Sequence, residues 1–345
     1  MLPSQCFGAS AEPWSRTISA DDRRLEELEN WLKGHADTSD LRPASEDASF
    51  RRYFRLNAGS ESLIAMDAPP PAEDCRPFVQ VAGYLRNMGL NAPRILKADL
   101  ERGFLLLSDL GADQYLDHLP AERDRLYRDA IDALLVIGIE GHAYRDALPP
   151  YDEALLSFEM SLFHDWLCEK YLGLEFSEDE EHEWGRTVSL LIDAALAQPR
   201  VFVHRDYHSR NLMVTETGNP GILDFQDAMN GPLTYDLVSL LKDCYIKWPY
   251  AFIESQAKRF FDAQQGLSLD WPEFQRFFDL MGVQRHLKAA GIFARLNLRD
   301  GKPGYMKDIP RTLSYITELA DVYEELEFLG GFVSGQVLPK LESMI

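Results

Sequence analysis

Hydrophobic and polar positions follow different patterns in the two parts of the chain on either side of residue 110. Before it, short apolar or alternating runs are bounded by Gly, Pro, Ser and Asp, which is typical of β-strands. After Gly111, apolar residues recur three and four positions apart through long segments, which indicates helices. The sequence therefore predicts an α+β protein with a flexible extension over 1–19, an N-terminal lobe over 20–110 and a helical C-terminal lobe over 111–345.

The N-terminal lobe is predicted to contain strands and two helices. Leu25, Leu28 and Leu32 recur at helical spacing, so one helix is expected from Ser19 or Asp21 onward. A second helix is expected over Asp74–Met88. The expected strands begin near Arg42 and continue with Phe50–Leu56, Ser62–Asp67, Ala92–Asp99 and Gly103–Gly111.

The C-terminal lobe is predicted to be built from helices around one polar segment. The expected helices cover residues 124–142, 153–172, 178–197, 250–265, 271–298 and 309–329. Between the last two, Arg295 to Tyr305 are expected to form a polar, basic loop. Met160, Phe163 and Trp166 have the spacing of one helix face, which favours a place in the core over contact with a ligand.

The polar segment covers residues 201–227. Short apolar runs precede Asp206 and follow Asn211, a Gly/Pro/Asn cluster at 217–221 predicts a turn, and Asp224 ends the next apolar run. This order predicts a loop and a hairpin that bring Asp206, Asn211 and Asp224 together. Phosphoryl transfer requires such a set, with one carboxylate for the attacking hydroxyl and oxygen ligands for Mg²⁺. The alternative, a polar turn containing Asp and Asn by chance, accounts less well for the fixed spacing.

The motif H-R-D-x-x-x-x-N at 204–211, followed by D-F at 224–225, resembles the catalytic and metal-binding motifs of the protein-kinase-like superfamily. The resemblance implies a two-lobed fold with a small antiparallel sheet and with ATP between the lobes. It implies Asp206 as the catalytic base and Asn211 and Asp224 as Mg²⁺ ligands. It also implies that the loop is braced by His204 and Asp236, and that adenine pairs with a hinge formed by Ser108, Asp109 and Leu110.

The N-terminal lobe departs from that superfamily in the groups that meet the phosphates. No G-x-G-x-x-G occurs in the first hairpin, where Ser49 lies, and Met66 stands near the position of the usual Lys. Ser49 and Met66 are nevertheless expected to contact ATP. The helix expected over 74–88 carries no Glu to pair with such a Lys. Other cations are therefore needed, and the nearest are Arg51, Arg52 and Arg55. Strand alternation places Arg52 on the opposite face from the other two, and a solvated sheet face is the alternative place for each.

Within the superfamily, the chain resembles the aminoglycoside phosphotransferase and choline kinase branch. His208 stands where that branch often has His, Asp224 is followed by F-Q-D in place of F-G, and G-P-L-T-Y-D-L-V-S-L-L comes soon afterwards. The segments D-A-S-F-R-R-Y-F-R, F-L-L-L-S-D-L-G, H-R-D-Y-H-S-R-N-L-M-V and R-D-G-K-P-G-Y resemble bacterial kinases of cell-wall recycling. That resemblance implies phosphorylation of the anomeric C1 hydroxyl of N-acetylmuramate or N-acetylglucosamine, which gives the α-1-phosphate.

The acceptor is expected beside the catalytic loop. The residues expected either to contact it or to brace the loop are Arg205, Tyr207, His208, Arg210, Gln226 and Asp227. The carboxylate of N-acetylmuramate needs a cation, for which the candidates are Arg295, Arg299 and Lys302, with a solvated loop as the alternative. Two other functions stay open. One is a kinase of the same fold for an amino alcohol or aminoglycoside, and the other is an inactive nucleotide-binding regulator, which the Met66 position suggests.

Composition and charge limit the classes of molecule that this protein is expected to bind. The formal net charge of −21 disfavours nonspecific nucleic-acid binding and means that ATP needs a locally basic or Mg²⁺-neutralised pocket. The cysteines are widely spaced and predict free thiols in a reducing cytoplasm: Cys6, Cys75, Cys168 and Cys244. Neither a signal-peptide pattern nor an apolar run of about 20 residues occurs. The expected partners are ATP and a small amino sugar, with no membrane and no obligate protein partner.

Overall fold

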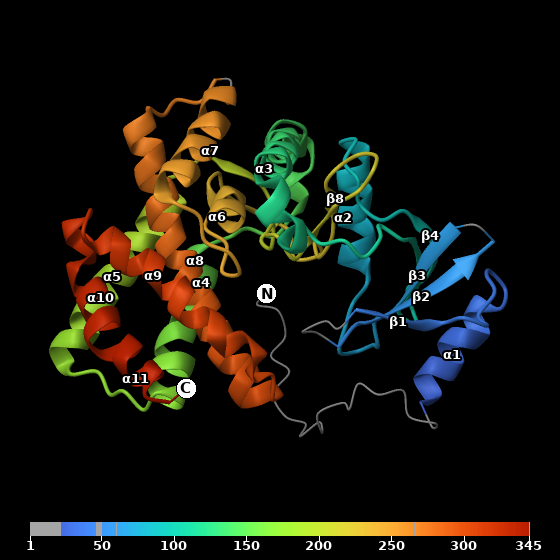
Figure 1. The fold of residues 1–345 in the computed structure, drawn as a ribbon, viewed down its shortest axis with the longest axis horizontal. Helices are drawn as coiled ribbons and strands as arrows, with labels where there is room; N and C mark the ends of the chain where they lie inside the picture. Colours follow the sequence, from blue (N-terminus) through green and yellow to red (C-terminus); the bar gives the residue numbers. More distant parts are fainter. Residues whose placement is uncertain (1–21, 46–49, 60, 265, 345) are drawn as a thin grey trace.

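A computed structural model of the chain describes residues 22–45, 50–59, 61–264 and 266–344. The longer strands form one sheet at one end of the molecule, and helices make up most of the rest (Figure 1), so the predicted α+β class is confirmed. The predicted extension over 1–19 lies outside the described residues, and so does Ser49. The predicted lobe boundary at residue 110 falls in the segment that joins the last strand of the sheet to the first long helix of the helical part.

Five antiparallel strands form the sheet in the order β1-β2-β3-β5-β4. Their bounds are Arg42–Ser45 (β1), Arg52–Ala58 (β2), Glu61–Asp67 (β3), Ile95–Asp99 (β4) and Phe104–Ser108 (β5). Because side chains alternate between the faces of a strand, Phe54 and Leu56 of β2 pack in one small core with the leucines of helix α1 (Arg23–Leu32). Met66 belongs to the other core, as do buried residues of α2 (Arg76–Asn87), which lies between the sheet and the helical part (Figure 1).

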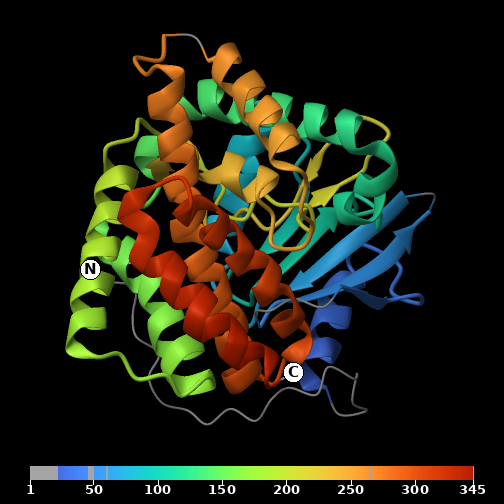
Figure 2. The same ribbon diagram turned by 60° about the vertical axis from the view of Figure 1, so that its left-hand side comes forward.

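The helical part is organised around α8 (Trp271–Asp300), the longest helix of the described chain. The elements that pack against it include α4 (Glu153–Leu162), the π-helix η3 (Phe163–Tyr171), α5 (Glu178–Leu196), α6 (Tyr235–Leu241) and α9 (Ile309–Ala320). The remaining helices are α3 (Tyr115–Glu140), α7 (Tyr250–Ala263), α10 (Glu327–Phe332) and α11 (Leu338–Glu342), besides short 3₁₀ and π turns. Figures 1 and 2 show that α9 and α10 lie on the far side of α8 from the sheet.

Two short strand pairs carry the polar segment. β6 (Arg200–Val203) pairs with β9 (Met229–Pro232), and β7 (Leu212–Met213) pairs with β8 (Gly221–Ile222). The predicted hairpin is confirmed as β7–β8. The apolar run before the loop is β6, which pairs with β9 and not with this hairpin. Because both pairs are antiparallel, the loop between β6 and β7 and the segment between β8 and β9 lie at the same end of the pairs.

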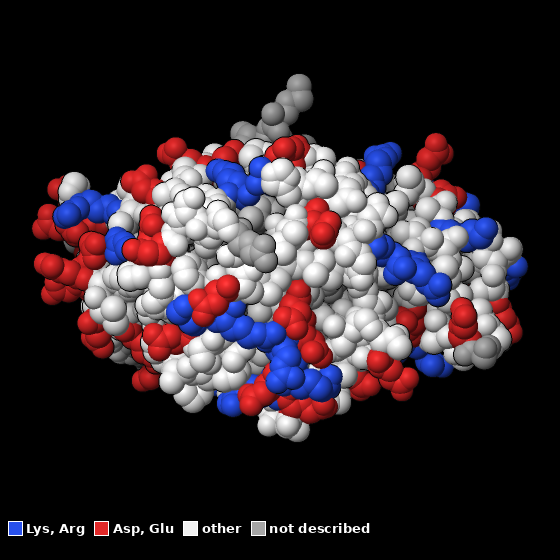
Figure 3. All heavy atoms as spheres, turned by 90° about the horizontal axis from the view of Figure 1, so that it is seen from above, with Lys and Arg blue, Asp and Glu red and all other residues white. Residues whose placement is uncertain are grey.

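The surface reflects the acidic composition. Asp and Glu side chains are spread over the face drawn in Figure 3, and Lys and Arg side chains gather in a band near its middle. No helix in the described part of the chain is both long and apolar enough to cross a bilayer.

The predicted basic loop over 295–305 is wrong in its first half. Residues as far as Asp300 continue α8, and the helix ends where Gly301 adopts the left-handed conformation with φ of 63°. Gly is the residue that most readily adopts this conformation, so Gly301 and not the polar composition marks the helix end.

The predicted helix over 309–329 is also divided. α9 stops at Ala320 and α10 begins only at Glu327. A Cβ at Gly330 would lie 2.2 Å from the Cβ of Ala320, so the chain turns back and packs α10 closely on α9. The periodicity of apolar residues does not reveal this reversal, because both helices bury one face.

α8 approaches the junction of α4 and η3 most closely at Gly291. A Cβ at this position would lie 2.2 Å from the carbonyl carbon of Leu162, a backbone atom that cannot rotate away. We expect Gly291→Ala to lower the free energy of unfolding by about 3 kcal/mol, measured by urea denaturation. Gly185→Ala in α5 is the matched control, because nothing lies within 4 Å of its added Cβ, and it should be neutral or stabilising. Equal destabilisation of both variants would contradict this packing.

His286 in α8 makes stability depend on pH. Its ring is fully buried, its Nε2 lies 2.9 Å from the carbonyl oxygen of Lys242, and burial lowers its pKa to about 3. The unfolded chain, with a His pKa of about 6.5, therefore takes up this proton first as the pH falls. We expect the wild type to lose about 2 kcal/mol more unfolding free energy than His286→Gln between pH 7.5 and 5. Urea denaturation at the two pH values measures this, and parallel losses would contradict it.

Candidate active site

The loop after β6 and the segment after β8 meet through Asn211. Its Nδ2 donates to the carbonyl oxygen of Asp206 at 2.9 Å and to Oδ2 of Asp224 at 3.3 Å. The structure thus brings together the three residues that the motif singled out. Because these bonds occupy the amide hydrogens of Asn211, its Oδ1 and the Asp224 carboxylate are the oxygen atoms suited to a divalent cation.

Asp236, near the start of α6, holds the first half of the loop. Its carboxylate accepts the backbone N–H of His204 at 2.6 Å and that of Arg205 at 3.0 Å. The N–H of Asp206 in turn donates to Nδ1 of His204 at 3.2 Å. Burial lowers the pKa of His204 to about 4, so its ring is neutral and Nδ1 can accept this bond. The backbone position of Asp206 therefore depends on both His204 and Asp236.

Asp243, which follows α6, holds the second half of the loop. It accepts the backbone N–H of Ser209 at 2.9 Å and its hydroxyl at 2.5 Å, and also the N–H of Tyr245 at 2.8 Å. Sequence analysis missed Asp243, because its place at the end of an apolar helix gave no signal of this contact.

The carboxylate of Asp206 lies in a cationic environment. Burial alone would raise its pKa, but nearby groups lower it to about 2: Lys288, His208, Arg205 and Arg285. Asp206 therefore stays ionised at neutral pH and is a weak base. Such a group can orient a hydroxyl by accepting its hydrogen bond, and it can take the proton as phosphoryl transfer proceeds.

A buried network beneath Arg205 was also missed. Glu159 of α4 is 2% exposed and forms ion pairs with Arg205 and, at 3.1 Å, with Lys288 of α8. Gln284 donates to the same carboxylate at 3.1 Å, and Tyr151 is bonded to it as well. The available signal was the polar run Q-R-H-L-K inside a long apolar helix, which is unusual for buried positions unless the groups are paired.

One candidate arginine lies just before β2, close to the start of α2. Arg51 forms an ion pair with Glu73 at 3.0 Å, just before that helix begins. Met66 is fully buried in the core and offers no polar group at the position of the usual Lys. The contacts of Arg51 and Met66 with ATP stay predictions.

The other two candidate arginines are held by carboxylates. Arg52 bonds to Asp67 at 2.7 Å and lies over Phe54, on the face that packs against α1 and away from α2. This position argues against the predicted phosphate contact of Arg52. Arg55 bonds to Asp109 at 2.5 Å and to the carbonyl oxygen of Gly111 at 2.9 Å, so it ties β2 to the predicted hinge.

A hollow of about 410 Å³ borders the predicted hinge. Its lining includes Ser108, Asp109 and Leu110 on one side and Thr215 and Thr217 of the β7–β8 turn on the other. The hydroxyl of Ser108 accepts the backbone N–H of Arg94 at 2.9 Å, so this side chain supports the hinge locally. Pairing of adenine with the hinge backbone stays a prediction.

The residues predicted to contact the acceptor or brace the loop have different surroundings in the structure. Tyr207 is fully buried and its hydroxyl donates to the carbonyl oxygen of Ala130 at 3.0 Å, so of the two expected roles the structure favours bracing of the loop over contact with the sugar. Gln226 donates to Oδ1 of Asp224 at 2.7 Å and orients that carboxylate. Asp227 is exposed, whereas His208 and Arg210 lie beside Asp206 and Asn211 on the loop.

The predicted carboxylate-binding residues near residue 300 are less well placed. Arg299 is exposed and bonds to Asp300 at 2.7 Å. Arg295 is half-buried, and its Nε has no hydrogen-bond partner in the described chain. Lys302 is half-buried beyond the end of α8. Their contact with an acceptor stays a prediction.

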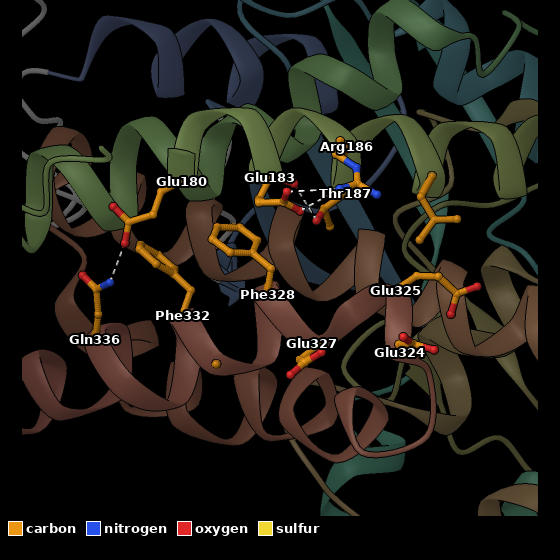
Figure 4. A pocket seen from close by; sticks show the side chains of 12 residues that line it. Glu180, Glu183, Arg186, Thr187, Glu324, Glu325, Glu327, Phe328, Phe332 and Gln336 are labelled. Carbon is orange, nitrogen blue, oxygen red and sulfur yellow. Dashed lines mark hydrogen bonds and ion pairs between the residues drawn. The ribbon is translucent and has the colours of Figure 1, made fainter. Parts of the chain in front are cut away.

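A larger hollow, of about 940 Å³, lies between α5 and the segment from η5 (Glu324–Leu326) to η6 (Val333–Val337). Figure 4 shows glutamate side chains around Phe328 and Phe332 in this groove. None of the predicted site residues lines it, so its size does not make it the active site.

Comparisons with known proteins agree with this geometry. An N-acetylmuramate/N-acetylglucosamine kinase from Pseudomonas aeruginosa is 48% identical over 328 residues, which cover 90% of this chain and 96% of that protein. A kinase of the same name from Neisseria meningitidis is 41% identical, and the match covers 88% of this chain and 93% of that protein.

Solved structures give the same fold at lower identity. The choline kinase LicA from Streptococcus pneumoniae has a TM-score of 0.58 at 11% identity, covering 84% of this chain and 99% of its own. The aminoglycoside phosphotransferase APH(4)-Ia, solved with ADP and hygromycin B, has a TM-score of 0.57 at 16% identity, covering 84% and 97%. Residues 40–277 match the phosphotransferase enzyme family, and together with the relatives at 48% and 41% identity this match shows that the chain belongs to that family.

Proposed function

We propose that this protein transfers the γ-phosphoryl group of ATP to the anomeric C1 hydroxyl of N-acetylmuramate or N-acetylglucosamine, giving the α-1-phosphate. The observation that carries the proposal is the meeting of Asp206, Asn211 and Asp224 in a chain whose relatives are named for these two sugars. A sugar 1-phosphate is the form that a nucleotidyl transferase consumes, so the reaction suits peptidoglycan recycling. The described cysteines are free and buried, which supports the predicted cytoplasmic location.

Asp206 acts on the acceptor, and Asp236 and Asp243 hold the loop that carries it. Asp206 accepts a hydrogen bond from the C1 hydroxyl, orients its oxygen toward the phosphoryl group and takes the proton late, because its pKa of about 2 makes it a weak base. Asp236 and Asp243 fix the backbone on either side of Asp206, so the carboxylate needs little rearrangement during the reaction.

A magnesium ion fits the oxygen atoms that the loop presents. Asn211 Oδ1 and the Asp224 carboxylate would hold it, and Gln226 orients the latter. When bound, Mg²⁺ neutralises charge on the phosphates of ATP.

The electrostatic environment also bears on the two alternative functions. The groups that lower the pKa of Asp206 are predominantly cations, which favours an acidic or neutral acceptor over a cationic amino alcohol or aminoglycoside. The assembled Asp206, Asn211 and Asp224 argue against an inactive regulator.

The test is ATP consumption in a coupled assay with a panel of N-acetylmuramate, N-acetylglucosamine, choline and an aminoglycoside. We expect turnover with one or both amino sugars and none with the two cationic acceptors. Turnover only with a cationic acceptor would overturn the assignment of substrate, and absence of turnover with every acceptor would support the regulator.

A further inference from the structure

Two arginine side chains beside the catalytic loop have no carboxylate in ion-pair contact within the described chain. They are Arg210 on the loop and Arg285 on α8. Other arginines near the predicted site, such as Arg55 and Arg205, are each bonded to a carboxylate. The chain has 56 Asp and Glu residues against 35 Lys and Arg residues, so partners for cations are in excess. Unpaired arginines at this place therefore call for another anion.

Arg285 is nearly enclosed by protein. Its residue is only 5% exposed, and among the described residues its guanidinium makes one hydrogen-bond contact, from Nη1 to Sγ of Cys244, a weak acceptor, at 3.9 Å. Its Nε is buried without a partner among the described residues. A buried cation with unused donors is costly unless an anion accepts from it.

Arg210 is held flat by aromatic rings. Its guanidinium carbon lies 3.8 Å from the centroid of the Tyr245 ring and 5.8 Å from that of Tyr305. Tyr305 in turn stacks on Phe293 of α8, with centroids 5.5 Å apart and planes 19° apart. Stacking fixes the plane of the guanidinium and leaves its N–H edge free to bind a carboxylate through two parallel hydrogen bonds.

His208 connects the two arginines in space. Its ring packs edge-on against Tyr245, with centroids 5.4 Å apart. Arg210 stacks on that same Tyr245, and Arg285 contacts the adjacent Cys244. In the part of the chain that the structure describes, Nδ1 of His208 is buried without a partner, while its Nε2 is 3.5 Å from Nδ2 of Asn211. The two arginines and His208 therefore meet around the Cys244–Tyr245 segment, next to the loop that carries Asp206.

We infer that Arg210 and Arg285 form a binding site for a carboxylate carried by the acceptor, next to the hydroxyl that Asp206 orients. The inference rests on the proposed function and makes it more specific. N-acetylmuramate carries a lactyl carboxylate and N-acetylglucosamine does not, so this site decides how strongly the enzyme prefers the acidic sugar.

The test compares kcat/KM for the two sugars at saturating Mg-ATP. In Arg210→Gln, we expect the ratio of kcat/KM for N-acetylmuramate to that for N-acetylglucosamine to fall about 10- to 100-fold, chiefly through KM. Arg285→Gln should shift the ratio in the same direction. Arg210→Lys keeps the charge but not the planar pair of donors, so it should restore only part of the preference. Arg186→Gln is the matched control and should leave the ratio unchanged, because Arg186 lies on α5, is exposed and already pairs with Glu183.

Two outcomes would overturn the inference while leaving the proposed function in place. An unchanged ratio in Arg210→Gln would show that this residue does not bind the carboxylate. An equal loss with both sugars, expressed in kcat, would show that the arginine contacts the transferred phosphoryl group instead. If Arg285→Gln fails to fold, as judged by its melting temperature, Arg210→Gln decides alone. A wild-type protein that phosphorylates neither sugar would overturn the proposed function and this inference with it.

Discussion

Replacement of Asp206 by Asn is expected to lower kcat by about 10³-fold. The amide has nearly the same shape but cannot take the proton of the attacking hydroxyl. The fold should survive, because the contacts that fix this part of the loop use the backbone of Asp206 and the side chains of His204 and Asp236. The measurement is the rate of ATP consumption with an amino sugar, together with the melting temperature of the variant.

Asp146→Asn is the control for the loss of one carboxylate, because the Asp146 side chain is 82% exposed and lies outside the site. We expect this variant to keep wild-type kcat. An Asp206→Asn enzyme that retained more than a tenth of wild-type kcat would be incompatible with Asp206 as the group that orients and deprotonates the acceptor.

Replacement of Asp224 by Asn should have an effect of similar size but a different signature. A metal ion supplies several kcal/mol of charge stabilisation, so loss of a ligand should lower kcat/KM by about 10³-fold and raise the Mg²⁺ concentration needed for half-maximal rate. Initial rates across a series of free Mg²⁺ concentrations at fixed ATP measure both quantities. In the wild type, EDTA should abolish activity and added Mg²⁺ should restore it.

Gln226 provides a graded comparison for this result. Its Nε2 bonds to Oδ1 of Asp224, so Gln226→Leu should also raise the Mg²⁺ concentration needed for half-maximal rate and should lower kcat/KM by about 10-fold. If Asp224→Asn and the wild type required the same Mg²⁺ concentration, Asp224 would not be a metal ligand.

The sequence was sufficient for the parts of the site that depend on local order. Asp206, Asn211 and Asp224 come from one loop and one hairpin, so their spacing and the apolar runs around them predict that they meet. The α+β class was predictable for the same reason, since strand and helix periodicities are local properties.

The missed residues depend on contacts between distant segments. Glu159 contacts Arg205 and Lys288 only because α4 and α8 pack side by side, and no local sequence pattern predicts that contact. Tyr207 lies in the catalytic motif, yet its ring turns into the core and its hydroxyl bonds to Ala130 of α3. Position in a motif therefore did not fix the direction of a side chain.

The boundary of the expected basic loop shows a different limit. The composition of residues 295–305 favoured a loop, but Arg295 and Arg299 lie on the last turns of α8, where Gly301 ends the helix. Polar composition describes exposure, whereas the backbone conformation available to Gly301 sets the helix end.

The measurement that tests the central claim most directly is the ³¹P NMR spectrum of the product formed from ATP, Mg²⁺ and N-acetylmuramate or N-acetylglucosamine. We predict an α-1-phosphate, recognised by coupling of its phosphorus to the anomeric proton, with the wild type and none with Asp206→Asn. A phosphate on another hydroxyl, or ADP formed without any sugar phosphate, would contradict the account.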